Sequence, residues 1–325
     1  MPEMKRVPIY IAAIILALLL AGCGGKKSSR DTAFRPVPFP AAPKVPSIIT
    51  DEVEASEYVI THFWDAFLGR NLPCDTNIVN GVLAEDVESA VGTYITVLEN
   101  NCGLEFGRKA VGDFLSALER FQAADTSSNV FGFFEKTVSR YLYDPNSPVR
   151  NEDLYLPFVQ GLAASPFVPE GMKQAYSHDA RMCSLNQGGT VATDFIFTDL
   201  SGRRHSLHGV KADHTLLFFS NPGCPACKEI IDGLTGDPRI AGKVSSGKLA
   251  VVNVYIDSDL DEWREYAVNY PETWLSGYDQ SYSIRTDVTY NVRAIPSLYL
   301  LDSEKRVIMK DAPTDKVLSC LAEID

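Results

Sequence analysis

The stretch TLLFFSNPGCPAC, residues 215–227, decides the fold. Residues 215–219 form a short apolar run that is typical of a buried strand. The following Cys224-Pro225-Ala226-Cys227 opens a helix, because proline is favoured at the first helical position, where its missing N–H is no loss. A strand that runs directly into a helix with two cysteines in its first turn predicts an α/β domain with a reactive site at that junction.

The two cysteines have different expected tasks. Unpaired N–H groups and the helix dipole favour the thiolate of Cys224 and lower its pKa from about 8.5, so Cys224 is the predicted nucleophile. Cys227 lies one turn further along and is the predicted resolving thiol, while Pro225 fixes the backbone between them. Zinc needs a second ligand pair, and c-type haem needs a histidine where Lys228 stands. We therefore expect a redox-active Cys224–Cys227 disulfide with no further cofactor and no metal.

The flanking sequence continues the pattern of strands and helices. Residues 195–207 indicate a hairpin with its turn at 199–202, and residues 249–257 a second buried strand. A helix is expected at 261–270, strands at 297–301 and 306–310, and a closing helix at 315–322. Alternating strands and helices predict an α/β sheet that is partly antiparallel at its end.

With Ile295-Pro296 placed before a later strand, residues 188–325 resemble the thioredoxin-like superfamily, in its TlpA-like or AhpC/TSA-like branch. The matching stretches are 192–195 (ATDF), 199–202 (DLSG), 224–227 (CPAC), 292–296 (VRAIP) and 299–302 (YLLD). The resemblance implies that Ile295 and Pro296 form a cis-proline loop that faces the cysteines and pairs with the backbone of a bound partner. It also implies thiol–disulfide exchange, and the isoleucine before the proline favours reduction.

Two positions depart from the pattern of this superfamily. Phe218 stands where thioredoxins carry a buried acid, and Gly223 replaces the usual tryptophan before the first cysteine. Proton transfer from the resolving thiol would then need another group, such as Glu229 or water. The residues that surround a peroxidatic cysteine are also missing, so we reject peroxide reduction.

The N-terminus predicts export and lipid anchoring. Residues 1–22 combine a positive start with a short apolar run, as in a signal peptide. They end in Leu20-Ala21-Gly22 before Cys23, which resembles the bacterial lipobox and implies a lipoprotein signal peptide with a lipid-modified Cys23. A plain signal peptide or an uncleaved anchor is the alternative. Residues 23–47 are polar and then proline-rich, which indicates an extended, lipid-anchored tether. In lipoproteins of the Bacteroidales type, an acidic stretch directly after the lipidated cysteine resembles a surface-export signal. Because no acidic residue stands immediately after Cys23, the resemblance implies a cell-envelope, periplasm-facing location.

Residues 48–187 predict an all-α body of four to six helices, because apolar residues recur there at helical spacing. Within it, residues 147–155 resemble an uncharacterised domain that precedes thioredoxin-like domains in lipoproteins of Bacteroidales. Its role is expected to be that of a substrate platform, a dimerisation surface or a spacer.

Four further cysteines remain. Cys74 and Cys102 lie near predicted helix ends, so we expect a structural disulfide between them in an oxidising compartment. Cys183 and Cys320 either bridge the ends of the α/β domain or stay as buried thiols. His205, His208 and His214 are close in sequence, but no fixed period brings them together as metal ligands.

The formal net charge of −12 over 325 residues leaves no basic footprint for a nucleic-acid partner. The leading hypothesis is a membrane-tethered oxidoreductase that reduces or exchanges disulfides of exported proteins and takes electrons from a membrane thiol donor. The rival hypothesis is a non-catalytic binding or assembly lipoprotein that holds a partner through its thioredoxin-like domain. Copper binding by the Cys224 and Cys227 thiolates is a third.

Overall fold

The computed structural model describes residues 34–324, and contacts group Pro36–Asp325 as one compact unit. The predicted signal peptide and Cys23 lie outside the described residues. Between residues 34 and 324, no helix has both the length and the apolar character that crossing a membrane requires.

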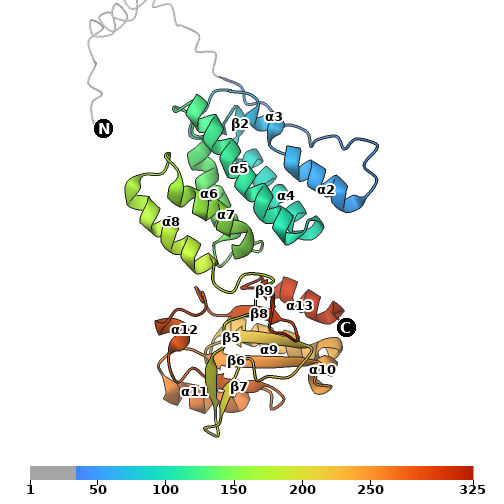
Figure 1. Ribbon diagram of the computed structural model, residues 1–325, viewed down its shortest axis with the longest axis vertical. Coiled ribbons are helices and arrows are strands. Elements are labelled where there is room, and N and C mark those ends of the chain that lie inside the picture. The colour runs from blue at the N-terminus through green and yellow to red at the C-terminus, as the bar shows by residue number, and fades with distance from the viewer. Residues whose placement is uncertain (1–33, 325) are drawn as a thin grey trace, which may run out of the picture. The chain divides into compact units, whose positions relative to one another are not determined.

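The N-terminal body is helical, as predicted, and its longer helices lie side by side (Figure 1). Its helices are α2 (Glu52–His62), α3 (Asp65–Leu68), α4 (Ala84–Asn101), α5 (Leu104–Ala124), α6 (Val130–Leu142), α7 (Glu152–Ala164) and α8 (Glu170–Cys183). This is more than the four to six expected, because the four-residue α3 is too short to give a periodic signal. A small hairpin, β1 (Ile78–Val79) with β2 (Val82–Leu83), precedes α4 and departs from the all-α prediction.

Aromatic side chains form the centre of the helical core. The ring of Trp64 stacks on Phe114 at 4.7 Å and meets the edge of Phe134 at 5.0 Å. All three side chains are buried, as apolar stripes on amphipathic helices predict. The sequence therefore placed these rings correctly as packing residues.

Part of the segment predicted as a tether packs on the helical body. The Val37 N–H donates a hydrogen bond to the Gly81 carbonyl at 2.9 Å. The Phe39 ring lies 5.5 Å from Phe67 and 5.8 Å from Trp64. The many prolines indicated an extended linker. The apolar residues between them, however, bury hydrophobic surface by packing against the helical body.

The C-terminal domain is a seven-stranded mixed sheet with the strand order β4-β3-β7-β6-β5-β8-β9. The strands are β3 (Ile196–Asp199), β4 (Arg204–Ser206), β5 (His214–Phe219), β6 (Leu249–Tyr255), β7 (Leu275–Tyr278), β8 (Ser297–Leu301) and β9 (Val307–Lys310). The helices are α9 (Pro225–Gly236), α10 (Pro238–Ser245), α11 (Leu260–Tyr266), α12 (Ser283–Thr286) and α13 (Thr314–Glu323), with a 3-10 turn at Ala267–Asn269. The predicted hairpin, strands and closing helix are present, whereas α10, β7 and α12 were not foreseen.

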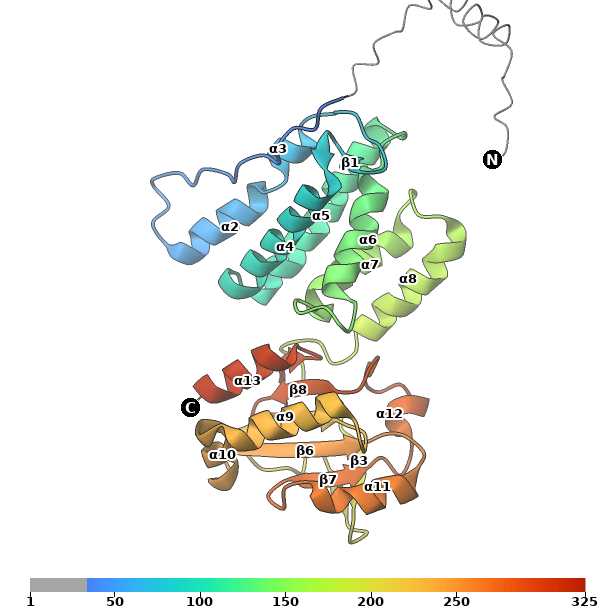
Figure 2. The same cartoon turned by 180° about the vertical axis from the view of Figure 1, so that it is seen from behind.

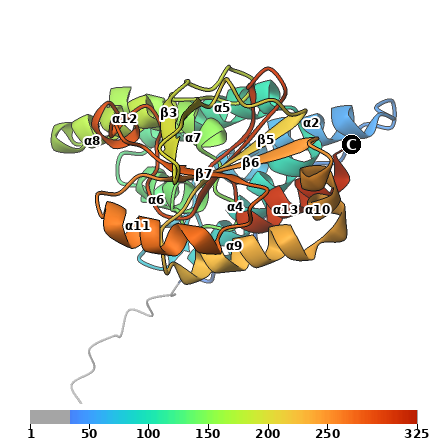
Figure 3. The same cartoon turned by 90° about the horizontal axis from the view of Figure 1, so that it is seen from below.

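The central strand β5 pairs in parallel with β6 and antiparallel with β8. Both faces of the sheet are covered, which explains why the strands read as continuous apolar runs. Helices α9 and α13 contact one another on one face, where Figures 2 and 3 show them next to the sheet. The opposite face is covered by Leu207, Ile284 and Tyr290. The turn from β5 into α9 lies at the carboxyl end of this central strand.

Candidate active site

The structure joins Cys224 and Cys227 in a disulfide, with their Cα atoms 5.2 Å apart. Cys224 is the N-cap of α9 and Pro225 is its first residue. Cys224 is half-buried, whereas Cys227 is only 2% exposed and packs with Ile230 and Leu234 in the core below the helix. One sulfur is therefore open to a partner and the other is shielded.

A backbone N–H in the first turn of α9 points at Cys224 Sγ, the more exposed sulfur of the disulfide. The Cys227 N–H donates a hydrogen bond to Cys224 Sγ at 3.2 Å. An N–H group at the start of a helix stabilises a negative charge on that sulfur more than a neutral thiol. This geometry is the one expected for an attacking thiolate at Cys224 once the pair is reduced.

The Ile295-Pro296 peptide bond is cis and leads directly into β8. Residue Ser297 of β8 pairs with Phe219 at the end of β5, so the loop lies at the same edge of the sheet as the cysteines. Ile295 and Cys224 pack against the same apolar cluster. The structure thus brings together the two motifs that the sequence separates by about 70 residues.

The departures at Phe218 and Gly223 have a structural explanation. Phe218 is fully buried beside Cys227 in the apolar cluster, and its ring meets Trp274 at 6.4 Å. Gly223 has a φ of +66°, a left-handed conformation that a tryptophan would adopt only with strain. Glu229 is exposed and two positions after Cys227 on α9, so it faces away from the buried sulfur.

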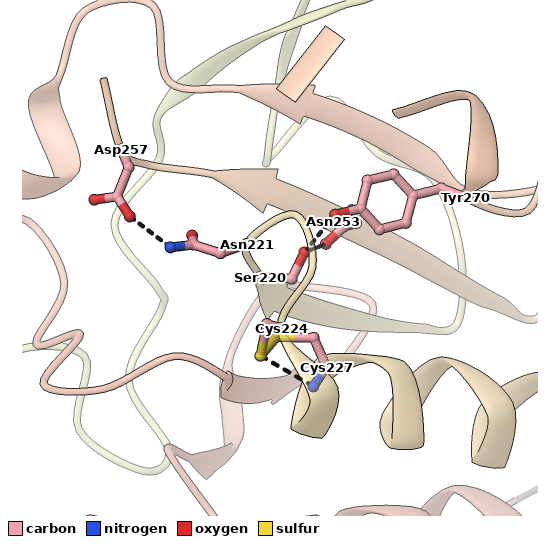
Figure 4. Close-up of a disulfide and its surroundings, with 7 residues drawn as sticks. All are labelled: Ser220, Asn221, Cys224, Cys227, Asn253, Asp257 and Tyr270. Atoms are coloured by element: carbon pink, nitrogen blue, oxygen red, sulfur yellow. Dashed lines mark hydrogen bonds between the residues drawn. A yellow bond between two sulfur atoms is a disulfide. The ribbon is translucent and has the colours of Figure 1, made fainter. Parts of the chain in front are cut away.

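A polar cluster at the end of β5 was missed by the sequence analysis (Figure 4). Ser220 donates to Asn253 Oδ1 at 2.5 Å and lies 3.1 Å from the Tyr270 hydroxyl, while Asn221 donates to Asp257 at 2.6 Å. Burial raises the pKa of Tyr270 above its ordinary value, so this hydroxyl stays protonated. The pairs join residues more than 30 positions apart, which no spacing rule in one sequence reveals.

The disulfide expected between Cys74 and Cys102 is absent, because both thiols are free. Cys74 accepts a hydrogen bond from the Asn80 N–H at 3.2 Å, close to the start of α4, whereas Cys102 caps the opposite end of that helix. An 18-residue helix is about 27 Å long, so the two sulfurs cannot meet. The prediction was wrong because both cysteines lie near helix ends, but near opposite ends of the same long helix.

Cys183 and Cys320 are also free, so the structure has no bridge between them. Cys183 is buried, as the second alternative expected, whereas Cys320 is only half-buried. Cys183 is fully buried, and burial raises the pKa of its thiol far above the ordinary value. Burial likewise raises the pKa of Cys320.

Two of the three histidines make local side-chain contacts, and His214 is the first residue of β5. His205 lies 2.9 Å from Asp199 in the hairpin, and His208 lies 2.8 Å from the Ala192 carbonyl. Over residues 34–324, no cluster of three or more His, Cys, Asp or Glu side chains has the arrangement of a metal site.

Comparisons with known proteins match both halves of the chain. Residues 23–186 match the family described as a domain of unknown function, DUF5106, and residues 212–307 match a family described as thioredoxin-like. A crystal structure of a thioredoxin-like protein from Bacteroides caccae is 35% identical, covers 88% of this chain and 98% of that one, and has a TM-score of 0.74.

Two further relatives match the C-terminal half. The thioredoxin-like protein YneN of Bacillus subtilis is 32% identical over 127 residues, which is 38% of this chain and 69% of YneN. The C-terminal domain of an uncharacterized Bacteroides fragilis protein is 44% identical over 42% of this chain and 99% of its own, with a TM-score of 0.41. The chain therefore belongs to the thioredoxin-like proteins and carries a DUF5106 domain before its thioredoxin-like domain.

Proposed function

We propose that the chain is a membrane-tethered, periplasm-facing thiol–disulfide oxidoreductase that reduces or exchanges disulfides of exported proteins. The observation that carries the proposal is the Cys224–Cys227 disulfide at the N-terminus of α9, with one sulfur half-buried and the other shielded. A purely structural disulfide has no need of an accessible sulfur at a helix N-terminus.

The reaction proceeds in two exchange steps from the reduced pair. The Cys224 thiolate attacks one sulfur of the partner disulfide, forms a mixed disulfide and releases the other partner sulfur as a thiolate. Cys227 then loses its proton and attacks Cys224, which restores the Cys224–Cys227 disulfide and frees the second partner thiolate. Two electrons pass to the partner, and a membrane thiol donor returns them to the pair.

Phe218 and its apolar neighbours determine which step is slow. Burial among apolar side chains disfavours the thiolate of Cys227, so we expect its deprotonation to need water or hydroxide from the exposed side. We expect the release of the mixed disulfide, rather than its formation, to limit turnover.

A trapping experiment tests the proposed function. In the Cys227→Ser protein the mixed disulfide cannot be resolved, so exported partners should accumulate as covalent adducts that dithiothreitol releases. The Cys224→Ser protein is the matched control and should trap nothing. If Cys227→Ser traps no partner in the cell envelope, the non-catalytic binding lipoprotein becomes the better account.

A copper titration separates the third hypothesis. Thiolate coordination would give a stoichiometric Cu(I) complex that disappears in the Cys224→Ala protein. We expect the wild-type protein and the Cys224→Ala protein to bind Cu(I) alike.

A further inference from the structure

A buried carboxylate of the helical body contacts the loop that carries the cis-proline and the last residue of strand β9. Glu152, the first residue of α7, is 2% exposed. Its Oε1 accepts a hydrogen bond from Asn291 Nδ2 at 2.8 Å and lies 2.8 Å from Arg293 Nε, while its Oε2 lies 2.8 Å from Lys310 Nζ. The contacts to Arg293 and Lys310 are ion pairs, and the contact to Asn291 is an aligned hydrogen bond.

Arg293 is held by further groups on both sides of the domain boundary. Its guanidinium lies 4.1 Å from the centre of the Tyr143 ring, donates to the Tyr143 carbonyl, and binds Asp311 Oδ2 at 3.0 Å. The other oxygen of Asp311 accepts a hydrogen bond from the Ser297 hydroxyl at 2.7 Å. Arg293 and Ser297 stand on either side of Ile295-Pro296, so one charged cluster fixes both ends of the loop.

The cluster leaves little freedom to these side chains. The side chains of Glu152 and Lys310 are each 1% exposed, Asp311 is 6% exposed and Arg293 is 13% exposed. Buried charges are tolerated only with partners in good geometry, and removing one partner leaves the others uncompensated. Without the Glu152 charge, Lys310 keeps only the carbonyls of residues 183 and 185, and Arg293 keeps one carboxylate of two.

We propose that Glu152 is a positioning residue through which the helical body sets the geometry of the cis-proline loop. This inference rests on the proposed function, because the loop is the backbone against which a partner disulfide would lie. The role of the helical body is then to hold one wall of the substrate site rather than to act only as a spacer.

The test separates positioning from general stability by measuring two rates on the full chain in detergent. Glu152→Gln keeps the size of the side chain and removes its charge. Exchange with a disulfide-containing peptide should slow by about 10-fold or more, because misplacement by about 1 Å at a reacting centre has effects of up to 100-fold. Alkylation of Cys224 by iodoacetamide, which needs no loop, should stay within about 2-fold of wild type.

The matched control breaks another ion pair between the same two domains. Lys316 of α13 lies 3.3 Å from Glu99 of α4, and among the described residues it forms no ion pair with residues 291–297. Lys316→Met should leave both rates unchanged. Equal loss of both rates in Glu152→Gln, or no loss of either, would overturn the positioning role. If Glu152→Gln fails to fold, Arg293→Lys keeps the charge and removes the forked contacts, with the same expectation.

Failure of the proposed function would be visible separately. If the wild-type chain shows no thiol–disulfide exchange with any substrate, the proposed oxidoreductase function is refuted. Amide hydrogen exchange then tests the positioning role of Glu152 independently. Amides in the peptide 289–298 should exchange at least about 10-fold faster in Glu152→Gln than in wild type, and at the wild-type rate in Lys316→Met. An unchanged rate in Glu152→Gln refutes the positioning role whatever the chain does chemically.

Discussion

Cys224 and Cys183 have the same side chain in opposite surroundings. Cys224 is half-buried and receives an N–H at the start of α9, which favours its thiolate. Cys183 is fully buried beside Glu152, and both burial and that negative charge favour its neutral thiol. We therefore expect the two cysteines to differ in reactivity because their positions differ.

Labelling of the reduced protein tests this contrast. Because its pKa is raised, Cys183 stays protonated across pH 7–9, so raising the pH in that range should not expose a thiolate. We expect iodoacetamide at pH 8 to label Cys224 within minutes and Cys183 only in denaturant, as read by mass spectrometry of peptides. Labelling of Cys183 in the folded protein as fast as that of Cys224 would contradict this account.

The segment from Pro36 to Pro43 is an element that composition alone misassigns. Phe39 contacts three aromatic rings of the helical core, whereas Phe34, earlier in the same proline-rich stretch, is 36% exposed. The docked part therefore belongs to the folded helical body.

A pair of alanine substitutions measures this docking. Phe39→Ala should lower the free energy of unfolding by about 2 kcal/mol, the value for removing one large apolar side chain from a packed site. Phe34→Ala should change it by less than about 0.5 kcal/mol. Urea unfolding followed by circular dichroism gives both values, and equal effects of the two substitutions would refute the docking.

Much of the α/β domain could be predicted because its elements have strong local signals. The apolar run 215–219 predicts a strand, and the proline at position 225 predicts the start of a helix, each without help from the rest of the chain. Strand β7 gave no such signal, since Gly277 normally argues against a strand. The structure shows why it is required: a Cβ there would lie 2.7 Å from both the Phe197 ring and the Thr198 carbonyl.

The candidate site was only partly predictable. The cysteines and the loop were found because each is a compact motif in the sequence. The contacts of Glu152 with Asn291 and Arg293 join positions about 140 residues apart, and no periodicity links them. The disulfide between Cys74 and Cys102 was wrong for the same reason, because the distance along α4 is a property of the folded body.

At the scale of the whole molecule, the proposal joins an anchor, a helical body and a redox domain. Its anchor is open to a direct test. The wild-type chain should partition into the detergent phase of a Triton X-114 extract, because acyl chains on Cys23 supply about 0.8 kcal/mol for each buried methylene. Cys23→Ser should lose that partition, and a variant that still partitions like wild type would refute lipid attachment at this residue.

The reduction potential of the Cys224–Cys227 pair shows whether these cysteines are redox-active. The full chain in detergent would be equilibrated with dithiothreitol or glutathione buffers, and thiol labelling would be read by mass. We predict reversible cycling of this pair with a potential of about −270 mV, as in reducing thioredoxins, whereas about −120 mV would make the protein an oxidant. A pair that neither labels nor cycles in the folded protein would contradict the account.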